Sequence, residues 1–334
     1  MNPFLVCGVA GAVLEAGERE LLAELQPGGV ILFARNILTA GQTRALIAEL
    51  GTLPAPPVVV VDLEGGKVNR LRPLIGDLPA AAAAGAAGDG AARALGEAVG
   101  AACAWLGFGG VYAPVVDVAV PGGTLEEEER CFGADPARVV QRATAFLAGI
   151  EAYGLCACLK HYPGLGNGRV DSHLELPVLG DEVRQHRWVF SALEGPGRAV
   201  MVAHALAPAL GEGLAPASLS RTVVAGLDIW TGGPVVADDL EMGALAEYGS
   251  IPERAAAALL AGCDQVLVCN ALEERLAVAE HLREWAARDL SLAAALQRAQ
   301  TRVGRWGRRP RRLVTEGEAA ARAVLARERA GVPA

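Results

Sequence analysis

The feature that most constrains the fold is a series of eight short apolar runs, rich in β-branched or small residues, along the first 270 residues. The runs are FLVCGV (4–9), GVILF (29–33), PVVVVD (57–62), GVYAPVVDV (110–118), LCACLK (155–160), AVMVAH (199–204), PVVADD (234–239) and QVLVC (265–269). They are continuously apolar rather than alternating, which is typical of strands buried on both faces. We therefore predict eight buried strands.

Segments with helical spacing separate these runs. The clearest, rich in Ala, Leu, Glu and Arg, are 15–25, 40–50, 90–106, 137–152 and 252–261. Strand alternating with helix predicts βαβ units and a parallel sheet. Eight units in 334 residues favour an α/β fold, a (β/α)8 TIM-like barrel that forms a single domain over 1–334, with 305–334 as a peripheral helical tail. A doubly wound open sheet is the alternative, but VCGVAGAVLEAG fits its glycine-rich phosphate loop poorly.

Composition and charge argue against several classes of protein. The net charge of −8 does not suit a nucleic-acid-binding face, and the one basic cluster, 305–312, is predicted to be a solvated helix end. No run reaches the roughly 18 apolar residues of a membrane span, and the apolar N-terminus lacks the positive region of a signal peptide. The seven cysteines have neither zinc-type spacing nor a paired framework, which is typical of a reducing cytoplasm.

Nearly every run ends in polar or charged residues. These are Arg35 and Asn36, Asp62, Asp117, Lys160 and His161, His204, Asp238 and Asp239, and Asn270. In a barrel the carboxyl ends of the strands form one rim, where enzymes of this fold place their chemistry. A charge near a core is costly unless it is paired, so one polar pocket at this rim explains these residues better than a set of unrelated caps.

The chemistry of this pocket lacks the patterns of two common kinds of site. Neither HxxxH nor HxH occurs, so we expect no metal, and no serine lies in a nucleophile elbow. Carboxylates and fixed cationic donors together suit a neutral ligand with many hydroxyl groups, because each hydroxyl both donates and accepts a hydrogen bond. A sugar meets that description.

Eight motifs occur in an order and at spacings that resemble the short, single-domain β-N-acetylglucosaminidases of glycoside hydrolase family 3. They are GGVILFARNI (28–37), VDLEGGKVNRL (61–71), APVVDV (113–118), ERCFGADP (129–136), KHYPGLGNGRVDSH (160–173), PASLS (216–220), VVADDLEM (235–242) and AGCDQVLVCN (261–270). The resemblance implies a TIM-like barrel and a cytoplasmic enzyme of peptidoglycan turnover. Such an enzyme removes N-acetylglucosamine from a muramic acid partner and needs no cofactor.

The same resemblance implies roles for individual residues. It makes Asp238 the nucleophile and His173 the general acid/base, with Asp171 as the partner of His173 on the loop after the fifth run. It assigns the sugar hydroxyls to four residues and places two more at polar positions nearby. The four are Asp62, Arg130, Lys160 and His161, and the two are His204 and Asp117.

The loop after the fifth run explains why 159–177 holds one of only two lysines and two of five histidines. Larger relatives use a second domain to help supply the acid/base, whereas we expect this loop to supply it here. Three glycines in GLGNGRVDSH (164–173) let the loop fold over the pocket. Asp171 is expected to accept the imidazole N–H of His173 and to fix its tautomer.

Some positions depart from the family pattern. Leu165 stands where close relatives have a second histidine, Leu63 and Lys67 replace a glutamine and an arginine, Ala237 replaces a serine, and EEEER (126–130) is unusually acidic. None of these changes removes the nucleophile or the dyad. They leave the 2-substituent of the sugar and the leaving group open.

We therefore expect a retaining exo-β-N-acetylglucosaminidase, monomeric and cytoplasmic, that acts on N-acetylglucosaminyl muropeptides and has no nucleic-acid or membrane partner. Retaining glycosidases use two carboxylates, and here a histidine takes one of the two roles. One alternative is a β-N-acetylglucosaminide phosphorylase, because a neutral histidine does not repel phosphate as a carboxylate does. The others are a β-glucosidase and a non-catalytic barrel that binds a muropeptide.

Overall fold

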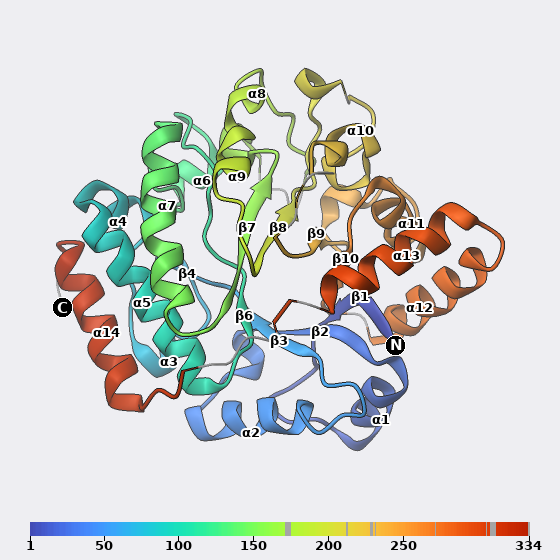
Figure 1. The fold of residues 1–334 in the computed structure, drawn as a ribbon, viewed down its shortest axis with the longest axis horizontal. Coiled ribbons are helices and arrows are strands. Elements are labelled where there is room, and N and C mark those ends of the chain that lie inside the picture. The colour runs from blue at the N-terminus through green and yellow to red at the C-terminus, as the bar shows by residue number, and fades with distance from the viewer. Residues whose placement is uncertain are drawn as a thin grey trace.

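Eight parallel strands close into a barrel in the order β1-β10-β9-β8-β7-β6-β3-β2 (Figure 1). The computed structural model describes residues 1–170, 175–211, 213–227, 230, 232–270, 272–304, 306–307 and 312–332. Helices surround the barrel on all sides in this view. The chain therefore has the predicted (β/α)8 TIM-like architecture of the α/β class.

The barrel strands coincide with the eight predicted runs. Their bounds are β1 (Asn2–Cys7), β2 (Pro27–Leu32), β3 (Val58–Val61), β6 (Gly110–Val111), β7 (Cys156–Tyr162), β8 (Arg198–Val202), β9 (Val235–Asp239) and β10 (Gln265–Val268). β6 is shorter than the predicted 110–118. Pro114 has no N–H to donate, and a single further bridge joins Val115 to Lys160.

A small antiparallel hairpin follows β3 and carries part of the candidate site. It consists of β4 (Leu63–Gly65) and β5 (Val68–Asn69). Gly65 has φ of +99°, and a Cβ there would lie 2.3 Å from the carbonyl oxygen of Pro79, so only glycine allows the turn to pack this closely. The apolar pattern does not predict this hairpin, because its strands are too short to form a run.

Helices cover the outside of the barrel. They are α1 (Ala16–Leu25), α2 (Ala40–Leu50), α3 (Arg72–Ile75), α4 (Ala81–Ala87), α5 (Asp89–Leu106), α6 (Thr124–Glu127), α7 (Pro136–Glu151), α8 (Val183–His186), α9 (Trp188–Ala192), α10 (Arg221–Val224), α11 (Ile251–Ala261), α12 (Leu272–Ala286), α13 (Leu290–Val303) and α14 (Glu316–Arg329). The five helices predicted from spacing correspond to α1, α2, α5, α7 and α11.

Small residues let α5 and α7 approach closely. A Cβ on Gly96 of α5 would lie 2.0 Å from the carbonyl oxygen of Phe146 on α7, and the buried face of α5 is largely Ala and Gly. Asp135 caps the N-terminus of α7, where its carboxylate accepts hydrogen bonds from two N–H groups of the first turn. Close backbone approach thus replaces bulky side chains, which is consistent with an aromatic content of only 4%.

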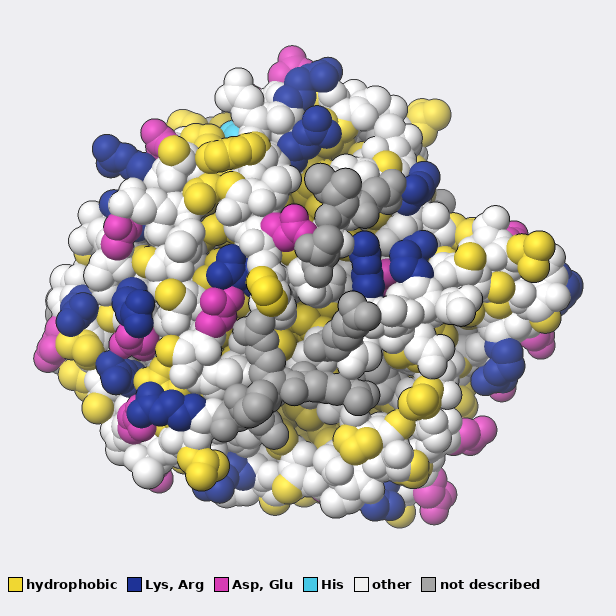
Figure 2. Space-filling model, viewed as in Figure 1, with side chains coloured by type: hydrophobic (Ala, Val, Ile, Leu, Met, Phe, Trp, Pro, Cys, Tyr) yellow, Lys and Arg dark blue, Asp and Glu magenta, His cyan; other side chains and the backbone are white. Residues whose placement is uncertain are grey.

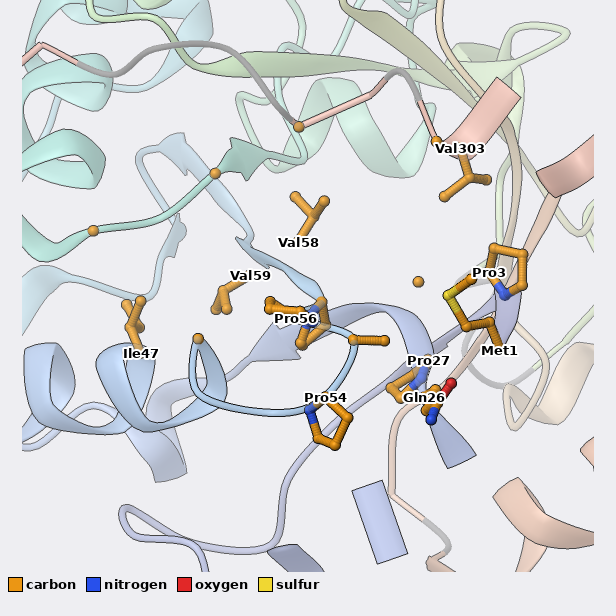
Figure 3. Close-up of a pocket in the computed structure, with 18 residues that line it drawn as sticks. Met1, Pro3, Gln26, Pro27, Ile47, Pro54, Pro56, Val58, Val59 and Val303 are labelled. Carbon is orange, nitrogen blue, oxygen red and sulfur yellow. The ribbon is translucent and has the colours of Figure 1, made fainter. Parts of the chain in front are cut away.

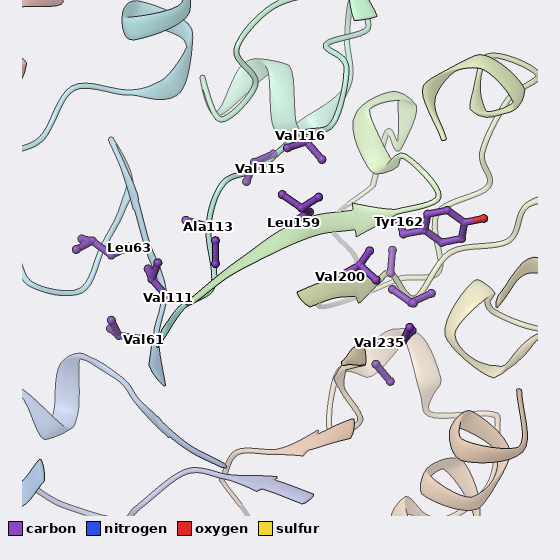
Figure 4. Close-up of a cluster of buried hydrophobic side chains, with 14 of the residues drawn as sticks. Val61, Leu63, Val111, Ala113, Val115, Val116, Leu159, Tyr162, Val200 and Val235 are labelled. Atoms are coloured by element: carbon purple, nitrogen blue, oxygen red, sulfur yellow. The ribbon is translucent and has the colours of Figure 1, made fainter. Parts of the chain in front are cut away.

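Side chains alternate along each strand between the inside and the outside of the barrel. Val60, Cys158 and Met201 belong to a cluster inside the barrel. Their neighbours Val61, Leu159 and Val200 pack outward in the layer between barrel and helices (Figure 4). Cys156 joins Cys158 in the inner cluster, and all seven cysteines are free and buried.

Trp306 fills the N-terminal end of the barrel. Its side chain is 3% exposed and belongs to the inner cluster. A Cβ on Gly110 or on Gly233 would lie 3.0 or 2.7 Å from its ring. The predicted solvated helix end at 305–312 is therefore wrong for Trp306, because burial of the large apolar ring outweighs the polarity of its neighbours. Residues 305 and 308–311 lie outside the described part of the chain.

The helical tail predicted within 305–334 is present as α14. It lies along α5 and near α3 (Figure 1). Arg322 forms a 2.8 Å ion pair with Glu97 of α5, and Arg327 donates a hydrogen bond to the carbonyl oxygen of Asp77. The buried residues of α14 itself are Ala319, Ala323 and Ala326.

The described residues include no membrane-spanning helix, and the face that Figure 2 shows has no basic strip among them. Among the described residues, no helix has both the length and the apolar character needed to cross a bilayer. On the face that Figure 2 shows, basic and acidic side chains are interspersed wherever the structure describes them. This distribution fits the net charge of −8.

Candidate active site

Polar side chains from several strand ends meet in an inner chamber of about 150 Å³ at the C-terminal mouth of the barrel. Its ionisable lining residues are Asp62, Glu64, Arg70, Tyr112, Arg130, Lys160, His161, Asp238, Asp239 and Cys269. The apolar part of the lining includes Ile31, Phe33, Met201, Met242 and Leu267. Five of the predicted site residues, namely Asp62, Arg130, Lys160, His161 and Asp238, are thus brought together.

Four ionised side chains form one network in this chamber, which we call the charged wall (Asp62, Glu64, Arg130 and Lys160). Lys160 Nζ lies 2.7 Å from Asp62 Oδ1 and 2.7 Å from Glu64 Oε1. The Arg130 guanidinium donates two parallel hydrogen bonds to Glu64, of 2.9 and 3.0 Å. Such bidentate pairing is the strong geometry for a buried ion pair.

The ion pairs of the charged wall keep Lys160 and Glu64 ionised in spite of burial. Burial alone would lower the pKa of Lys160, but the Asp62 and Glu64 carboxylates outweigh it and raise that pKa above its usual value. Burial alone would raise the pKa of Glu64, yet Lys160 and Arg130 bring it down to about 2. At neutral pH the wall therefore presents fixed charges of both signs.

Glu64 and Arg70 line the chamber although they are not among the predicted site residues. Glu64 links the two cations of the charged wall, and Arg70 lines the chamber. The Nε atom of Arg70 is buried and has no hydrogen-bond partner among the described residues. The available signal was the VDLEGGKVNRL motif, which contains both residues, but the apolar pattern draws attention only to the strand end at Asp62.

Asp117 acts on the chamber through His161. Its carboxylate accepts hydrogen bonds from the backbone N–H of His161 at 2.9 Å and from that of Leu165 at 2.6 Å. It also lies 2.8 Å from His161 Nδ1. Because a carboxylate only accepts, Nδ1 carries the proton and the other ring nitrogen, Nε2, remains for a ligand. Asp117 itself is 0% exposed, so it orients His161.

Asp238 reaches the chamber from a bulge in β9. The register between β9 and β10 shifts there, since Val266 pairs with Ala237 but Leu267 pairs with Asp239. Bulges of this kind re-aim side chains and are frequent beside active sites, and here Asp238 and Asp239 both line the chamber. Burial alone would raise the pKa of Asp238, but His204, His161 and nearby donors bring it below its usual value. Its carboxylate is therefore ionised.

Asp239 has the opposite character from its neighbour. Burial, reinforced by the Glu241 carboxylate, raises the pKa of Asp239 to about 7. Two adjacent carboxyl groups in one chamber thus differ in protonation near neutral pH. When the pair holds one proton, that proton is therefore on Asp239 and Asp238 is the carboxylate.

His204 supports the strand end that carries these two residues. It is 1% exposed, and its Nε2 lies 3.0 Å from the backbone carbonyl oxygen of Asp239. Nε2 must therefore donate, and Nδ1, 2.7 Å from the Ser218 hydroxyl, accepts. Burial lowers the pKa of His204, and its two hydrogen bonds fix the backbone beside Asp238.

Not every polar strand end lines the cavity, and the prediction of one pocket for all of them is wrong for five residues. Asp117 and His204, predicted near the sugar, are buried behind the lining, and Arg35, Asn36 and Asn270 also lie outside it. Asn36 donates to the backbone of the loop after β1, and Arg35 donates to the carbonyl oxygen of Cys269 and to the Asn270 side chain. These groups hold neighbouring loops of the barrel mouth together. They are caps and cross-links, which the pattern of strand ends cannot distinguish from ligand-binding groups.

An outer chamber of about 250 Å³ adjoins the inner one. The two share Val68, Arg130, His161 and Asp238. The remaining lining of the outer chamber is Lys67, Thr124, Leu125, Glu128, Leu165, Gly168 and Val170. The predicted acid/base His173 and its partner Asp171 lie outside the described residues, and the described chain stops at Val170 on the wall of this chamber.

A cavity at the opposite end of the barrel lacks catalytic groups. It measures about 550 Å³ and is lined by the N-terminal ends of strands and by the proline-rich segment before β3 (Figure 3). Val58, Pro27 and Val303 are typical of its lining, which has no ionisable side chain. The candidate active site is therefore the smaller, charged cavity at the other end.

No group of three or more His, Cys, Asp or Glu side chains in the described part of the chain has the arrangement of a metal site.

Comparison with known proteins gives a consistent result. The sequence profile of the glycosyl hydrolase family 3 N-terminal domain matches residues 8–305. A β-hexosaminidase of Alkalilimnicola ehrlichii is 38% identical over 307 residues, covering 83% of this chain and 84% of the relative. A β-hexosaminidase of Pseudomonas aeruginosa is 34% identical over 290 residues, covering 81% of this chain and 83% of the relative.

Solved structures are similar over nearly the whole chain. NagZ from Neisseria gonorrhoeae, in complex with N-trifluoroacetyl-D-glucosamine, has a TM-score of 0.77 at 30% identity and covers 97% of this chain and 96% of its own. A family 3 β-N-acetylglucosaminidase from a Paenibacillus species has a TM-score of 0.79 at 28% identity. This chain spans 62% of the length of the Paenibacillus enzyme.

Proposed function

Because the chain belongs to glycosyl hydrolase family 3 and is a glycoside hydrolase, we propose that it is a retaining exo-β-N-acetylglucosaminidase. The observation that carries the proposal is the position of Asp238. Its ionised carboxylate lines both chambers, beside the charged wall that suits a sugar. The substrates are peptidoglycan-derived muropeptides with a terminal N-acetylglucosamine, and the enzyme is a cytoplasmic monomer.

The charged wall binds the hydroxyl groups of the glycosyl unit. Lys160, Arg130 and Arg70 donate hydrogen bonds, and Asp62 accepts them, so each sugar hydroxyl finds a donor and an acceptor. His161 adds its Nε2, which Asp117 leaves free for the ligand. Charge-assisted hydrogen bonds of this type are stronger than neutral ones and fix the orientation of the sugar ring.

In the first chemical step, a carboxylate oxygen of Asp238 attacks C1 of the sugar. The bond from C1 to the leaving oxygen breaks, and that oxygen takes a proton from the protonated imidazole of His173. The products are a covalent glycosyl ester on Asp238, a neutral His173 and a free alcohol. Asp171 stabilises the protonated imidazole and holds its tautomer.

In the second step, neutral His173 removes a proton from water as the water oxygen attacks C1. The ester bond to Asp238 breaks and its carboxylate is restored. Two inversions at C1 give net retention, as in other retaining glycosidases. Neither step requires a metal or an organic cofactor.

Incubation with an aryl N-acetyl-β-glucosaminide, with and without millimolar phosphate, tests the proposal. We expect release of the phenol together with free N-acetylglucosamine, at a rate that phosphate does not change. N-acetylglucosamine 1-phosphate as the main product would mean that the protein is a phosphorylase. Turnover of the aryl β-glucoside alone would mean a β-glucosidase, and binding without turnover of either would mean a non-catalytic barrel.

A further inference from the structure

We propose that the outer chamber is the leaving-group subsite and that Leu165, with Leu125 and Val170, gives it an apolar wall that favours leaving groups with a hydrocarbon face. The inference rests on the proposed function, because it concerns the group that departs from C1. It assigns a specificity-determining role to Leu165.

The position of Asp238 fixes which part of the substrate each chamber receives. The inner chamber contains the charged wall, so it takes the hydroxyl-rich glycosyl unit. The outer chamber begins at the same carboxylate. C1 of the sugar must lie within bonding distance of Asp238, so the group attached to C1 points out of the inner chamber and into the outer one.

The outer chamber has a chemistry unlike that of the charged wall. Leu165 and Leu125 line it and are themselves 8% and 3% exposed, while Val68 and Val170 are half-buried at its edge. These four side chains carry no hydrogen-bonding group. They can therefore only contact carbon-bound hydrogens or a ring face, and burial of such surface is favourable.

Apart from Arg130, His161 and Asp238, which the outer chamber shares with the inner one, the charged groups of the outer chamber lie on its rim. Lys67 and Glu128 form an ion pair of 3.9 Å with side chains 65% and 35% exposed, which is long and well solvated, so it contributes little. The N–H of Thr124 is already bound to the carbonyl oxygen of Gly168. A leaving group thus meets an apolar wall inside and solvated charges outside.

Leu165 is held in place by the same carboxylate that orients His161. Asp117 accepts a 2.6 Å hydrogen bond from the backbone N–H of Leu165 and also contacts His161 Nδ1. The backbone at 165 is therefore fixed independently of the side chain. A substitution that keeps the backbone N–H changes the chemistry of the wall and leaves this hydrogen bond in place.

The test uses a homologous series of alkyl N-acetyl-β-glucosaminides, from methyl to n-hexyl. The alcohols released have similar acidity, so the series varies apolar area at nearly constant leaving-group chemistry. We expect kcat/KM of the wild-type protein to rise about 10-fold along the series. N-acetylglucosaminyl fluoride serves as the reference donor, because fluoride is too small to contact the wall.

Leu165→Asn, which is close to leucine in shape, should remove most of this rise while changing kcat/KM for the fluoride donor much less. Leu165→Met should retain the rise, because it restores an apolar side chain of similar volume. Leu38→Asn, at a position 62% exposed, is the matched control and should behave as wild type. Val170→Thr, an isosteric change at a half-buried position, provides a second variant and should weaken the rise about 2-fold.

A flat series in the wild-type protein, or an equal loss for hexyl glycoside and fluoride in Leu165→Asn, would overturn the proposal. In the second case Leu165 would act through His161 and the inner chamber. Failure of the proposed function gives a different result, since the wild-type protein would then release no N-acetylglucosamine from the fluoride donor.

Discussion

The two ends of the barrel hold buried charges of different kinds. At the N-terminal end, Asp264 is 0% exposed and accepts hydrogen bonds from the Val235 N–H, Arg298 and Arg302. At the C-terminal mouth, Asp238 faces two chambers, and Arg70 leaves its Nε without a described partner. The Asp264 carboxylate is thus satisfied by hydrogen bonds within the protein. Asp238 and Arg70, in contrast, face a cavity that a ligand can fill.

The same strands build both ends, so the difference arises from the segments that flank each strand. The residues before the strands pack with Trp306 and the proline-rich segment and, apart from the paired Asp264, form a mainly apolar end (Figure 3). The residues after the strands form the charged wall and the bulge at Asp238. We propose that the N-terminal end contributes stability and the C-terminal end contributes chemistry, as is general for this fold.

The largest effect separates the two ends by activity. Asp238→Asn removes the proposed nucleophile and should lower kcat on an aryl N-acetyl-β-glucosaminide roughly 10⁴-fold or more. Asp181→Asn, at an exposed position, should leave kcat unchanged. Retention of more than a tenth of the activity by Asp238→Asn would mean that another group attacks C1.

The second prediction separates the two ends by stability. Trp306→Ala removes the plug at the N-terminal end and should lower the free energy of unfolding by about 3–5 kcal/mol, measured by denaturant titration. Below the unfolding transition, kcat should stay within about 2-fold of wild type, since the change lies at the other end of the barrel. Trp188→Ala, at a position 51% exposed, is the matched control. A large loss of kcat in the folded variant would show that the ends are coupled.

The third prediction concerns the pH dependence of the charged wall. The pKa of Glu64 falls from 4.5 to about 2 on folding, so its contribution to stability is fully present above pH 4.5 and is lost as the pH falls towards 2. Linkage puts this contribution at about 3 kcal/mol. Glu64→Gln should lower the free energy of unfolding at pH 7 and flatten its decrease in acid.

The exposed Glu20→Gln is the control for this comparison and should reproduce the wild-type pH profile. If the free energy of unfolding fell equally with pH below 4.5 in Glu64→Gln and in wild type, the charged wall would not shift the pKa of Glu64.

The smallest predicted effect has the opposite sign. The pKa of Asp239 rises from 3.8 to about 7 on folding, so the folded state is penalised as the pH rises above 3.8, and fully so above about 7. Linkage alone would put this penalty at about 4 kcal/mol. An amide at 239 accepts the hydrogen bond from the Glu241 N–H more weakly than the carboxylate does, so Asp239→Asn should raise the free energy of unfolding at pH 8 by a net of about 1–2 kcal/mol and have no such effect at pH 3. Destabilisation at pH 8 would mean that the carboxylate is stabilised by its surroundings.

Much of the fold can be predicted from the sequence, because buried parallel strands are marked by continuous apolar runs. All eight runs are barrel strands, and the five clearest helical segments are helices. The β4–β5 hairpin is too short to produce a pattern, and Trp306 is hidden among arginines. The hairpin and the burial of Trp306 both depend on contacts with residues far away in the sequence, so local composition does not predict them.

The candidate site can be predicted in part. Asp62, Lys160, His161 and Asp238 follow strands, and their convergence is a consequence of barrel geometry. Glu64 lies on the hairpin and Arg70 directly follows it, so their place in the chamber depends on a turn at Gly65. The roles of Asp117 and His204 as orienting groups depend on hydrogen bonds that no sequence spacing specifies. His173 and Asp171 lie outside the described residues, and their catalytic role remains a prediction.

The central claim is that Asp238 at the C-terminal mouth forms a covalent bond with the sugar. Its most direct test is incubation with a 5-fluoro N-acetylglucosaminyl fluoride, followed by proteolysis and mass spectrometry. The account predicts one adduct, on Asp238 within the peptide that contains VVADDLEM, and its absence in Asp238→Asn. A label on Asp239, or turnover of the aryl substrate without any trapped adduct, would contradict it.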